Sequence, residues 1–388
     1  MKKRILASTK IGYELPVEEA ILFSGTEAGF CYMPDDVDTL LNEEETRTSK
    51  RAKGTMKSGH HSVFGHPSYC FALEELPKIM AIILNNEKVY QTSEKSARYT
   101  KMKPSKQEKD LYEKWIDLYK KEIDKIYPYQ EGVSAEKRDA AITKKAQENA
   151  RYLISVFTPA TSMGHTLDLR QLSYEIHWAE EFIEKEPDTA FNKKLKPVLK
   201  DFVENFSEYK VEDINTEVKN RKFSLFADRQ REEEFGENYS INYLGTFAQL
   251  AQAQRHRTLS YEIMLLDEPK YYIPPIIKGT KLEEEWIKDI SSLKEFFPQG
   301  MLVWINERGT VENFILKCKE RLCGEAQLEI AQQTKDTLDR YLLETKDVKP
   351  NIYNYLKDYS KGARCTFPGY KCSRPCIWGA KGALDRKF

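Results

Sequence analysis

The segment QAQRHRTLSYE, residues 252–262, places an arginine on either side of a histidine. Guanidinium groups bind phosphate and other anions through paired hydrogen bonds, and a histidine between them is suited to polarise a bound heterocycle. Gln252 lies three residues before Arg255 and shares its helix face, while Ser260 follows Arg257 by three residues. The pattern predicts a site for an anionic ring system. The alternative is a basic helix end exposed to solvent.

A second group lies in SGHHSVFGH, residues 58–66, which holds three of the six histidines of the chain within seven residues. Zinc is one interpretation, but neither a carboxylate nor a cysteine stands nearby at a ligand spacing. We therefore expect a polar loop that lines a ligand pocket, with hydrogen-bonded loop histidines as the alternative.

A third group is SEKSARY, residues 93–99, in which Ser96 precedes Arg98 by two residues. A hydroxyl, a guanidinium and backbone N–H groups in one loop are able to hold a phosphate together. Arg321, followed by the small residues Cys323 and Gly324, is a further candidate for an inward-facing cation.

The carboxyl-terminal tail holds Cys365, Cys372 and Cys376. These three thiols are one ligand short of a tetrahedral zinc site, and no histidine follows them, so a metal site here is the minority interpretation and we assign no metal ligands. The whole chain has seven cysteines at irregular spacing, which favours reduced thiols and a cytoplasmic protein.

Composition narrows the functional classes. Lysine plus arginine and aspartate plus glutamate each count 61 in the 388 residues, so the net charge is zero. A neutral chain has no overall field that attracts nucleic acid or a membrane surface. No apolar run approaches 18 residues, and the basic start MKKRIL lacks an apolar continuation, so we expect neither a membrane span nor a cleaved leader.

The elements that must position these groups are mostly helices. Residues 66–73 alternate as in a strand, and an apolar helix opened by Pro77 follows them. A charged stretch around 42–53 has the composition of an irregular segment. Helical periodicity predicts further helices at 106–126, 136–157, 167–185, 246–254, 282–296, 309–323 and 325–345. A short strand at 238–243 precedes residues 246–254, so the second half repeats the order of the first, which indicates an internal duplication.

Together these motifs resemble the flavin-dependent thymidylate synthases, whose signature is Arg-His-Arg-x-x-Ser-x-Asn-Glu-x-Ser-x-Arg-Tyr. The second half matches the beginning of that signature and the family's later Asn-x-Arg and Arg-x-Cys-x-x-Ala-Gln elements, but it lacks the Ser-x-Arg end. The matching residues are Gln252, Arg255, His256, Arg257, Ser260, Asn306, Arg308, Arg321, Ala326 and Gln327.

The first half resembles the complementary part. SGHHSVFGH matches the family's histidine segment, with Gly65 in place of a glutamate, and Glu94, Ser96 and Arg98 match the end of the signature. The same count puts residues 86–88, Asn-Glu-Lys, where Arg-His-Arg would stand. Two further elements are also present in this half. Arg151 matches the family's Ala-Arg element, and Arg170 falls on the arginine of Asn-x-Arg with Asp168 in place of the asparagine.

The resemblance implies an α+β fold in two tandem copies, each with helices around a small, mostly antiparallel sheet. The expected boundaries are 1–208 for a first copy that keeps the nucleotide loop and 209–388 for a second copy with the flavin motif, with a cysteine-rich tail from about 362. Because family members are homotetramers with sites at subunit interfaces, such a fusion would dimerise into a pseudo-tetramer with two complete sites.

The resemblance also implies the reaction and the roles of the residues. dUMP would be methylated to dTMP with methylenetetrahydrofolate, FAD and NADPH. His256 and Arg321 would be catalytic. The flavin would be held by Arg255, His256, Arg257, Asn306, Arg308, His66 and Ser62. The nucleotide would be held by Gln252, Glu94, Ser96, Arg98, Arg151 and Arg321.

Two alternatives remain. Gly65 and the shortened loop after Glu262 fit a diverged flavoenzyme that modifies C5 of another pyrimidine nucleotide. A paralogue that binds flavin or nucleotide without catalysis is the other.

Overall fold

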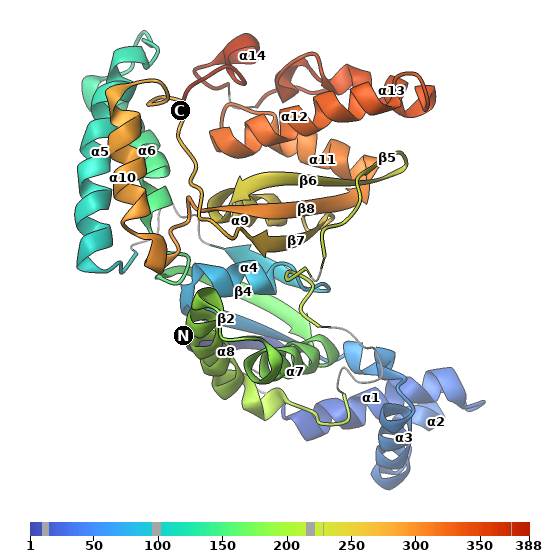
Figure 1. The fold of residues 1–388 in the computed structure, drawn as a ribbon. Coiled ribbons are helices and arrows are strands. Elements are labelled where there is room, and N and C mark those ends of the chain that lie inside the picture. The colour runs from blue at the N-terminus through green and yellow to red at the C-terminus, as the bar shows by residue number, and fades with distance from the viewer. Residues whose placement is uncertain (10–14, 95–101, 215–221, 228, 374) are drawn as a thin grey trace. The chain divides into compact units, whose positions relative to one another are not determined.

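The computed structural model describes residues 1–388 except 10–14, 95–101, 215–221, 228 and 374. The chain forms two compact units that are not contiguous in sequence (Figure 1). The first consists of Met1–Lys103 and Pro159–Ser224, and the second of Pro104–Thr158 and Leu225–Phe388. The expected division at 208/209 differs from these units because the segment Pro104–Thr158 packs into the second.

The first unit is built on a four-stranded antiparallel sheet in the order β1-β2-β4-β3. Its strands are β1 (Lys2–Ser8), β2 (Ser68–Pro77), β3 (Gln91–Glu94) and β4 (Pro159–Asp168). Its helices are α1 (Val17–Tyr32), α2 (Val37–Leu41), α3 (Glu45–Lys57), α4 (Lys78–Leu84), α7 (Leu169–Lys185) and α8 (Ala190–Phe206). Every residue of α4 is buried, which agrees with the apolar helix expected after Pro77.

The second unit has a sheet of the same kind, in the order β5-β6-β8-β7. Its strands are β5 (Glu234–Phe235), β6 (Asn238–Thr246), β7 (Ser260–Leu265) and β8 (Leu302–Thr310). Its helices are α5 (Lys106–Ile126), α6 (Ala135–Ala150), α9 (Phe247–Ala253), α10 (Lys281–Ser291), α11 (Val311–Arg321), α12 (Leu328–Thr345), α13 (Pro350–Leu356) and α14 (Gly379–Gly382). The molecule is therefore helix-rich and α+β, as expected.

Two cores stabilise the second unit. On one face of the sheet, the rings of Tyr239, Phe314 and Tyr341 meet at centroid distances of 5.2–5.5 Å, so α11 and α12 pack on β6. A separate helical core joins α5, α6 and α10 (Figure 1). There Trp115 meets Trp286 edge to face at 4.8 Å. This core is the reason that residues 104–158 belong to the second unit.

The two sheets share their register as well as their strand order. In the first unit, Ala72 pairs with Gly164, which pairs with Ser93. In the second, Asn242 pairs with Asn306, which pairs with Glu262. Gly164 therefore stands at the position of Asn306, and Thr166 at that of Arg308. The expectation that Asp168 and Arg170 replace Asn-x-Arg was wrong, because Asp168 lies four residues later and caps α7.

The helix starts give the same relationship for the flavin motif. α4 begins at Lys78 and α9 at Phe247, and each follows the strand in the same way. Counted from these helix starts, residues 86–88 occupy the same positions in the first unit as Arg255–Arg257 in the second, in agreement with the sequence comparison. The first unit thus has the scaffold of the motif without its side chains.

Three local expectations were wrong. The charged stretch around 42–53 is helical in α3, because its buried residues recur on one face of the helix. The helix expected at 136–157 ends at Ala150. Strands β4 and β8 were not expected, although they lie at the centre of their sheets. In the part of the chain that the structure describes, no helix is long and apolar enough to cross a bilayer.

Candidate functional site

The Arg-His-Arg segment lies where α9 ends. The Thr246 hydroxyl caps the start of this helix by accepting a hydrogen bond from the Gln249 N–H at 3.0 Å. After Ala253 the chain forms a 3-10 turn over Gln254–His256, and Arg257 ends it with a left-handed φ of 52°. Arg255 and Arg257 are exposed, whereas the His256 side chain lies outside the described residues. Two cations are thus presented at a helix carboxyl end, where the helix dipole favours positive charge.

Arg321, the last residue of α11, is held against this segment. Its Nη2 donates to the backbone oxygen of Gln252 at 3.1 Å. Burial, together with the positive charge of Arg255, lowers the pKa of Arg321 to about 10, so the group is still a cation at neutral pH. The Arg321 Nε and the Gln252 Oε1 are buried without a hydrogen-bond partner among the described residues. Such atoms carry a cost that a bound polar ligand would remove.

Asn306 and Arg308 lie on one face of β8, two residues apart. The amide nitrogen of Asn306 donates to Ser240 Oγ at 2.9 Å, and its oxygen accepts from Arg308 Nη1 at 3.0 Å. Arg308 also forms an ion pair of 2.6 Å with Glu262, which pairs with Arg231 as well. The charge of Arg308 is therefore balanced within the second unit.

Arg151 also lies in the second unit, at the turn that follows α6. Its guanidinium donates to the side-chain oxygen of Gln327, whose own amide contacts the Tyr152 hydroxyl. The Tyr152 hydroxyl donates to Glu329 at 2.7 Å. Burial raises the pKa of Glu329, which also accepts two hydrogen bonds from Thr246. This network joins Arg151 to the start of α9 and thus to the element that carries the Arg-His-Arg segment.

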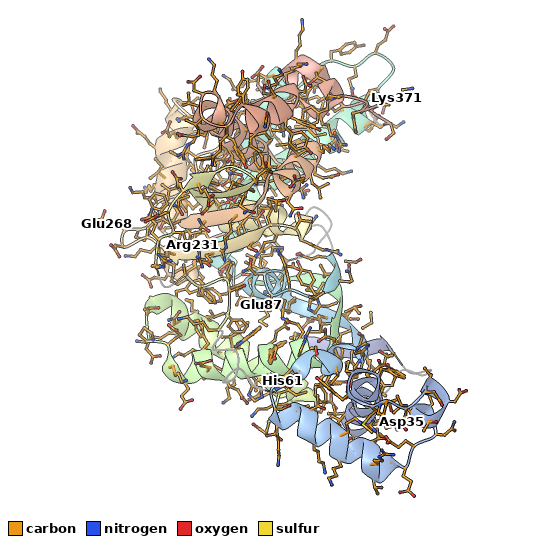
Figure 2. All side chains as sticks on the ribbon, turned by 90° about the vertical axis from the view of Figure 1, so that its right-hand side faces the viewer. Asp35, His61, Glu87, Arg231, Glu268 and Lys371 are labelled. Carbon is orange, nitrogen blue, oxygen red and sulfur yellow. The ribbon has the colours of Figure 1, made fainter. Side chains whose placement is uncertain are left out.

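The histidine segment lies in the first unit as a short 3-10 helix, His61–Gly65. His61 is buried, with its Nδ1 2.7 Å from the Tyr174 hydroxyl (Figure 2). Ser62 is exposed, and the imidazole of His66 lies 3.6 Å from the Glu27 carboxylate. His61 thus fits the alternative of a hydrogen-bonded loop histidine, while Ser62 and His66 face solvent.

Glu94 ends β3 in the first unit and is already partnered. Lys78 pairs with its carboxylate at 2.5 Å, and the Asn85 amide donates to it at 3.3 Å. Ser96 and Arg98, the other two candidates of this loop, lie outside the described residues.

Glu87 stands in the first unit at the position of His256 in the second, and it has a structural role. It is fully buried and accepts hydrogen bonds from the backbone N–H of Ser224 at 2.6 Å and from its hydroxyl at 2.9 Å (Figure 2). Asn86, at the position of Arg255, donates to the same hydroxyl at 2.8 Å. In the first unit, the position of His256 is therefore occupied by a residue that hydrogen-bonds to the backbone of the same chain.

The structure thus brings some candidates together and separates others. Among the candidates, the second unit holds Arg151, Gln252, Arg255, His256, Arg257, Asn306, Arg308 and Arg321, and the first holds Ser62, His66 and Glu94. Sequence reasoning missed three partners. Glu262 pairs with both Arg308 and Arg231, and Arg364 of the tail lies near enough to Arg321 to lower its pKa. The pairing of Glu262 was signalled only by its place in the strand opposite Asn306.

Comparison with solved structures finds several of low identity. A thymidylate synthase X from Helicobacter pylori with FAD and dUMP is 15% identical, with a TM-score of 0.31, and the match covers 55% of this chain and 98% of that chain. A second structure of the Helicobacter pylori enzyme, also complexed with FAD and dUMP, is 14% identical with a TM-score of 0.30, covering 55% and 100%. A UMP/dUMP methylase, PolB, from Streptomyces cacaoi bound with 5-Br dUMP is 14% identical with a TM-score of 0.34, covering 54% and 91%.

No curated protein matches the chain. A family model does: the one described as thymidylate synthase complementing protein matches residues 24–177. That range contains the histidine segment, the SEKSARY loop and Arg151, which carried the resemblance in the first half. Residues 24–177 of the chain are thus similar to this family of thymidylate synthases.

Proposed function

We propose that this chain is an FAD-dependent enzyme that reductively methylates C5 of dUMP, with methylenetetrahydrofolate as the carbon donor and NADPH as the reductant. One observation carries the proposal beyond the match to the family model. A buried guanidinium, Arg321, lies beside Arg255 and the Arg-His-Arg turn with polar atoms unpartnered, as a site for an anionic nucleotide requires.

The residues at the turn fit a flavin nucleotide. Arg255 and Arg257 offer exposed guanidiniums to a pyrophosphate, and Arg257 adopts a left-handed conformation that turns the chain sharply there. His256 lies between them and would contact the ring system. When bound, the flavin supplies the redox chemistry, and the protein positions the reactants and excludes water. Asn306 and Arg308, fixed to each other and to Glu262, would support the turn from the neighbouring strand.

Arg321, Gln252 and Arg151 would hold the nucleotide from the second unit. Arg321 would pair with its phosphate, and the free Gln252 Oε1 would accept a hydrogen bond from a nucleotide N–H or hydroxyl. The Arg151 guanidinium donates a hydrogen bond to the side-chain oxygen of Gln327, and on nucleotide binding it would exchange this neutral partner for the phosphate.

We further propose that the two halves are tandem copies of the family's fold and that two chains form a pseudo-tetramer with two sites. Glu94, Ser96 and Arg98 of one chain would complete the nucleotide site, with Ser62 and His66 beside the flavin. Two features support this reciprocal arrangement. The strand register repeats, and Glu87 occupies the first copy's flavin position as a structural residue.

The test separates the two halves of the site. Arg257→Gln is expected to give a colourless protein, because FAD is lost, whereas Arg98→Gln is expected to stay yellow and bind dUMP more weakly. Both should lose release of tritium from C5-labelled dUMP. Arg138→Gln is the matched control, because the Arg138 guanidinium contacts Asp124 and Tyr127 and none of the candidate site residues. If Arg257→Gln and Arg98→Gln have the same effects on FAD and dUMP, the proposed division is wrong.

A second candidate is methylation of another pyrimidine nucleotide. Gly65 stands where the family has a glutamate, and a Cβ there would lie 3.4 Å from both Arg170 Nη2 and Asp168 Oδ2. The position that the family gives to an acidic side chain thus borders an ion pair of this chain, which an added carboxylate would contact directly. Parallel assays with dUMP, UMP and dCMP decide between the substrates, and a purified protein without flavin would favour a non-catalytic paralogue.

A further inference from the structure

Cys323 lies far in the sequence from the three tail cysteines, Cys365, Cys372 and Cys376, and the fold of the second unit brings it next to the tail. Cys323 lies in the turn after α11, and 42 positions later Cys365 begins the cysteine-rich tail. The Arg364 N–H donates to the Leu322 oxygen at 2.7 Å, so the residues that precede the two cysteines are joined by a backbone hydrogen bond. The sequence showed three thiols in the tail, and the fold brings a fourth to them.

Cys376 approaches the same turn from the other end of the tail. A Cβ placed on Gly324 would lie 2.7 Å from Cys376 Sγ, well inside van der Waals contact. It would also lie 2.7 Å from Trp378 Cδ1. Only a glycine after Cys323 therefore lets Cys376 lie this close to the turn.

A buried cation adjoins these thiols. Arg386 is 5% exposed, and its hydrogen bonds go to the backbone oxygens of Ala383 and Ala326. Within the described residues it has no ion pair, and its Nε has no hydrogen-bond partner. Burial lowers its pKa, while the nearby carboxylates of Glu148 and Glu325 act in the opposite direction. A buried guanidinium without an ion pair is costly, so an anionic centre closer to it would stabilise it.

We propose that Cys323, Cys365, Cys372 and Cys376 bind one zinc ion, which fastens the carboxyl-terminal tail to the end of α11. Four thiolates form a closed tetrahedral site with Zn–S distances of about 2.3 Å, typical of structural zinc. The complex carries two net negative charges, which Arg386 would partly offset. Among the described residues no three donors already surround one point, so the ion would draw the neighbouring thiols together.

The proposed site also fixes two arginines. Cys323 follows Arg321 by two residues, and Cys365 follows Arg364 directly. Arg364 donates to the Lys319 oxygen of α11 at 3.2 Å and lies close enough to Arg321 to lower its pKa. A zinc ion would hold Arg364 beside Arg321, and this part of the inference rests on the proposed nucleotide site.

The first experiment measures metal in the full-length protein purified without chelator. Elemental analysis should give one zinc per chain, and displacement of the ion by a mercurial should release that zinc to a colorimetric dye. Cys323→Ser, Cys365→Ser, Cys372→Ser and Cys376→Ser should each lose most of it. Cys31→Ser is the matched control, because Cys31 is exposed and lies in the first unit. It should keep one zinc per chain.

A second measurement does not depend on any variant. Iodoacetamide labelling followed by peptide mass spectrometry should find the four cysteines protected in the native protein and modified after chelation, with Cys31 modified in both samples. Iron in place of zinc, or four thiols that react freely without a chelator, would overturn the proposal. Protection that a phosphine reductant removes and a chelator does not would also overturn it, since that result identifies a disulfide. None of these readouts depends on FAD or dUMP, so failure of the proposed function leaves the zinc result intact.

Discussion

The guanidinium of Arg321 donates a hydrogen bond of 3.1 Å to the backbone oxygen of Gln252, which joins the end of α11 to the end of α9. The two helices follow adjacent strands, β8 and β6, of one sheet, so the register of that sheet fixes the distance between these residues. The bond uses one N–H group of the guanidinium, and the Nε remains unpartnered among the described residues. A charged group is therefore positioned by the fold and still has hydrogen-bonding capacity for a ligand.

Replacement of Arg321 should weaken nucleotide binding more than flavin binding. In Arg321→Gln the amide keeps a donor for the Gln252 oxygen but loses the charge that would pair with a phosphate. A hydrogen bond to a charged group contributes about 1.5–3 kcal/mol, so the Kd for dUMP should rise roughly 10- to 150-fold. Isothermal titration with dUMP measures this change, and the flavin spectrum reports whether FAD is retained. Unchanged dUMP affinity would remove Arg321 from the proposed site.

Glu87 should matter for stability and not for flavin content. Its carboxylate accepts two hydrogen bonds from Ser224 in a fully buried position. In Glu87→Gln the amide oxygen still accepts from these N–H and O–H groups, but the negative charge that strengthens both hydrogen bonds is lost, which should cost about 1–3 kcal/mol and lower the thermal midpoint. The FAD-to-chain ratio should stay at one in both proteins, that is, two per dimer. A ratio of two per chain in the unaltered protein would show that the first unit also binds flavin and would contradict the pseudo-tetramer.

The sequence predicted helices better than strands, for a physical reason. α9 and α12 have apolar residues at helical spacing, and both are close to where they were expected. β8 was missed because its central sequence, INER, places polar Asn306 and Arg308 on one face and the buried Glu307 on the other. A strand that is polar on both faces lacks the alternation that identifies most strands.

The candidate site was only partly predictable. Gln252, Arg255 and Arg321 were found because a motif fixes their types and spacing, and the fold brings them together. The placement of Arg151 in the second unit was not predictable, because it depends on the packing of α5 and α6 against α10. Cys323 was overlooked as a partner of the tail since 42 positions separate it from Cys365. Such long-range contacts are set by tertiary packing, which local patterns do not encode.

The pair of Lys317 and Glu307 should be a strong determinant of stability. Both side chains are fully buried, with Nζ and Oε2 2.5 Å apart, and Tyr239 and Tyr243 also donate to the carboxylate. Lys317→Met leaves the carboxylate without its counter-ion, and breaking a buried pair in this way costs about 3–5 kcal/mol. The double variant Lys317→Met/Glu307→Gln removes both charges and should be more stable than Lys317→Met alone. Thermal and urea unfolding of the three proteins measures the difference.

The second unit should become less stable in acid, because protonation of Glu262 removes a stabilising charge. Burial alone would raise its pKa, but the guanidiniums of Arg231 and Arg308 outweigh that effect and hold it below the ordinary value of 4.5. A carboxyl group with a lowered pKa in the folded state stabilises the fold at any pH above its unfolded value. That contribution is lost as the pH falls through the lower folded value, so the loss begins below about pH 4.5.

Glu262→Gln isolates this contribution. The variant should be less stable than the unaltered protein at neutral pH, because Arg231 and Arg308 then face each other without a carboxylate. The difference in free energy of unfolding should shrink as the pH is lowered below about 4.5, since both proteins then have a neutral group at this position. Urea titrations between neutral pH and about pH 3 measure it. The matched control is Glu233→Gln, whose carboxylate pairs with Arg340 at the surface and should contribute about 0–1 kcal/mol. A stability difference for Glu262→Gln that stays constant across the pH range would show that the Glu262 carboxylate does not titrate with folding.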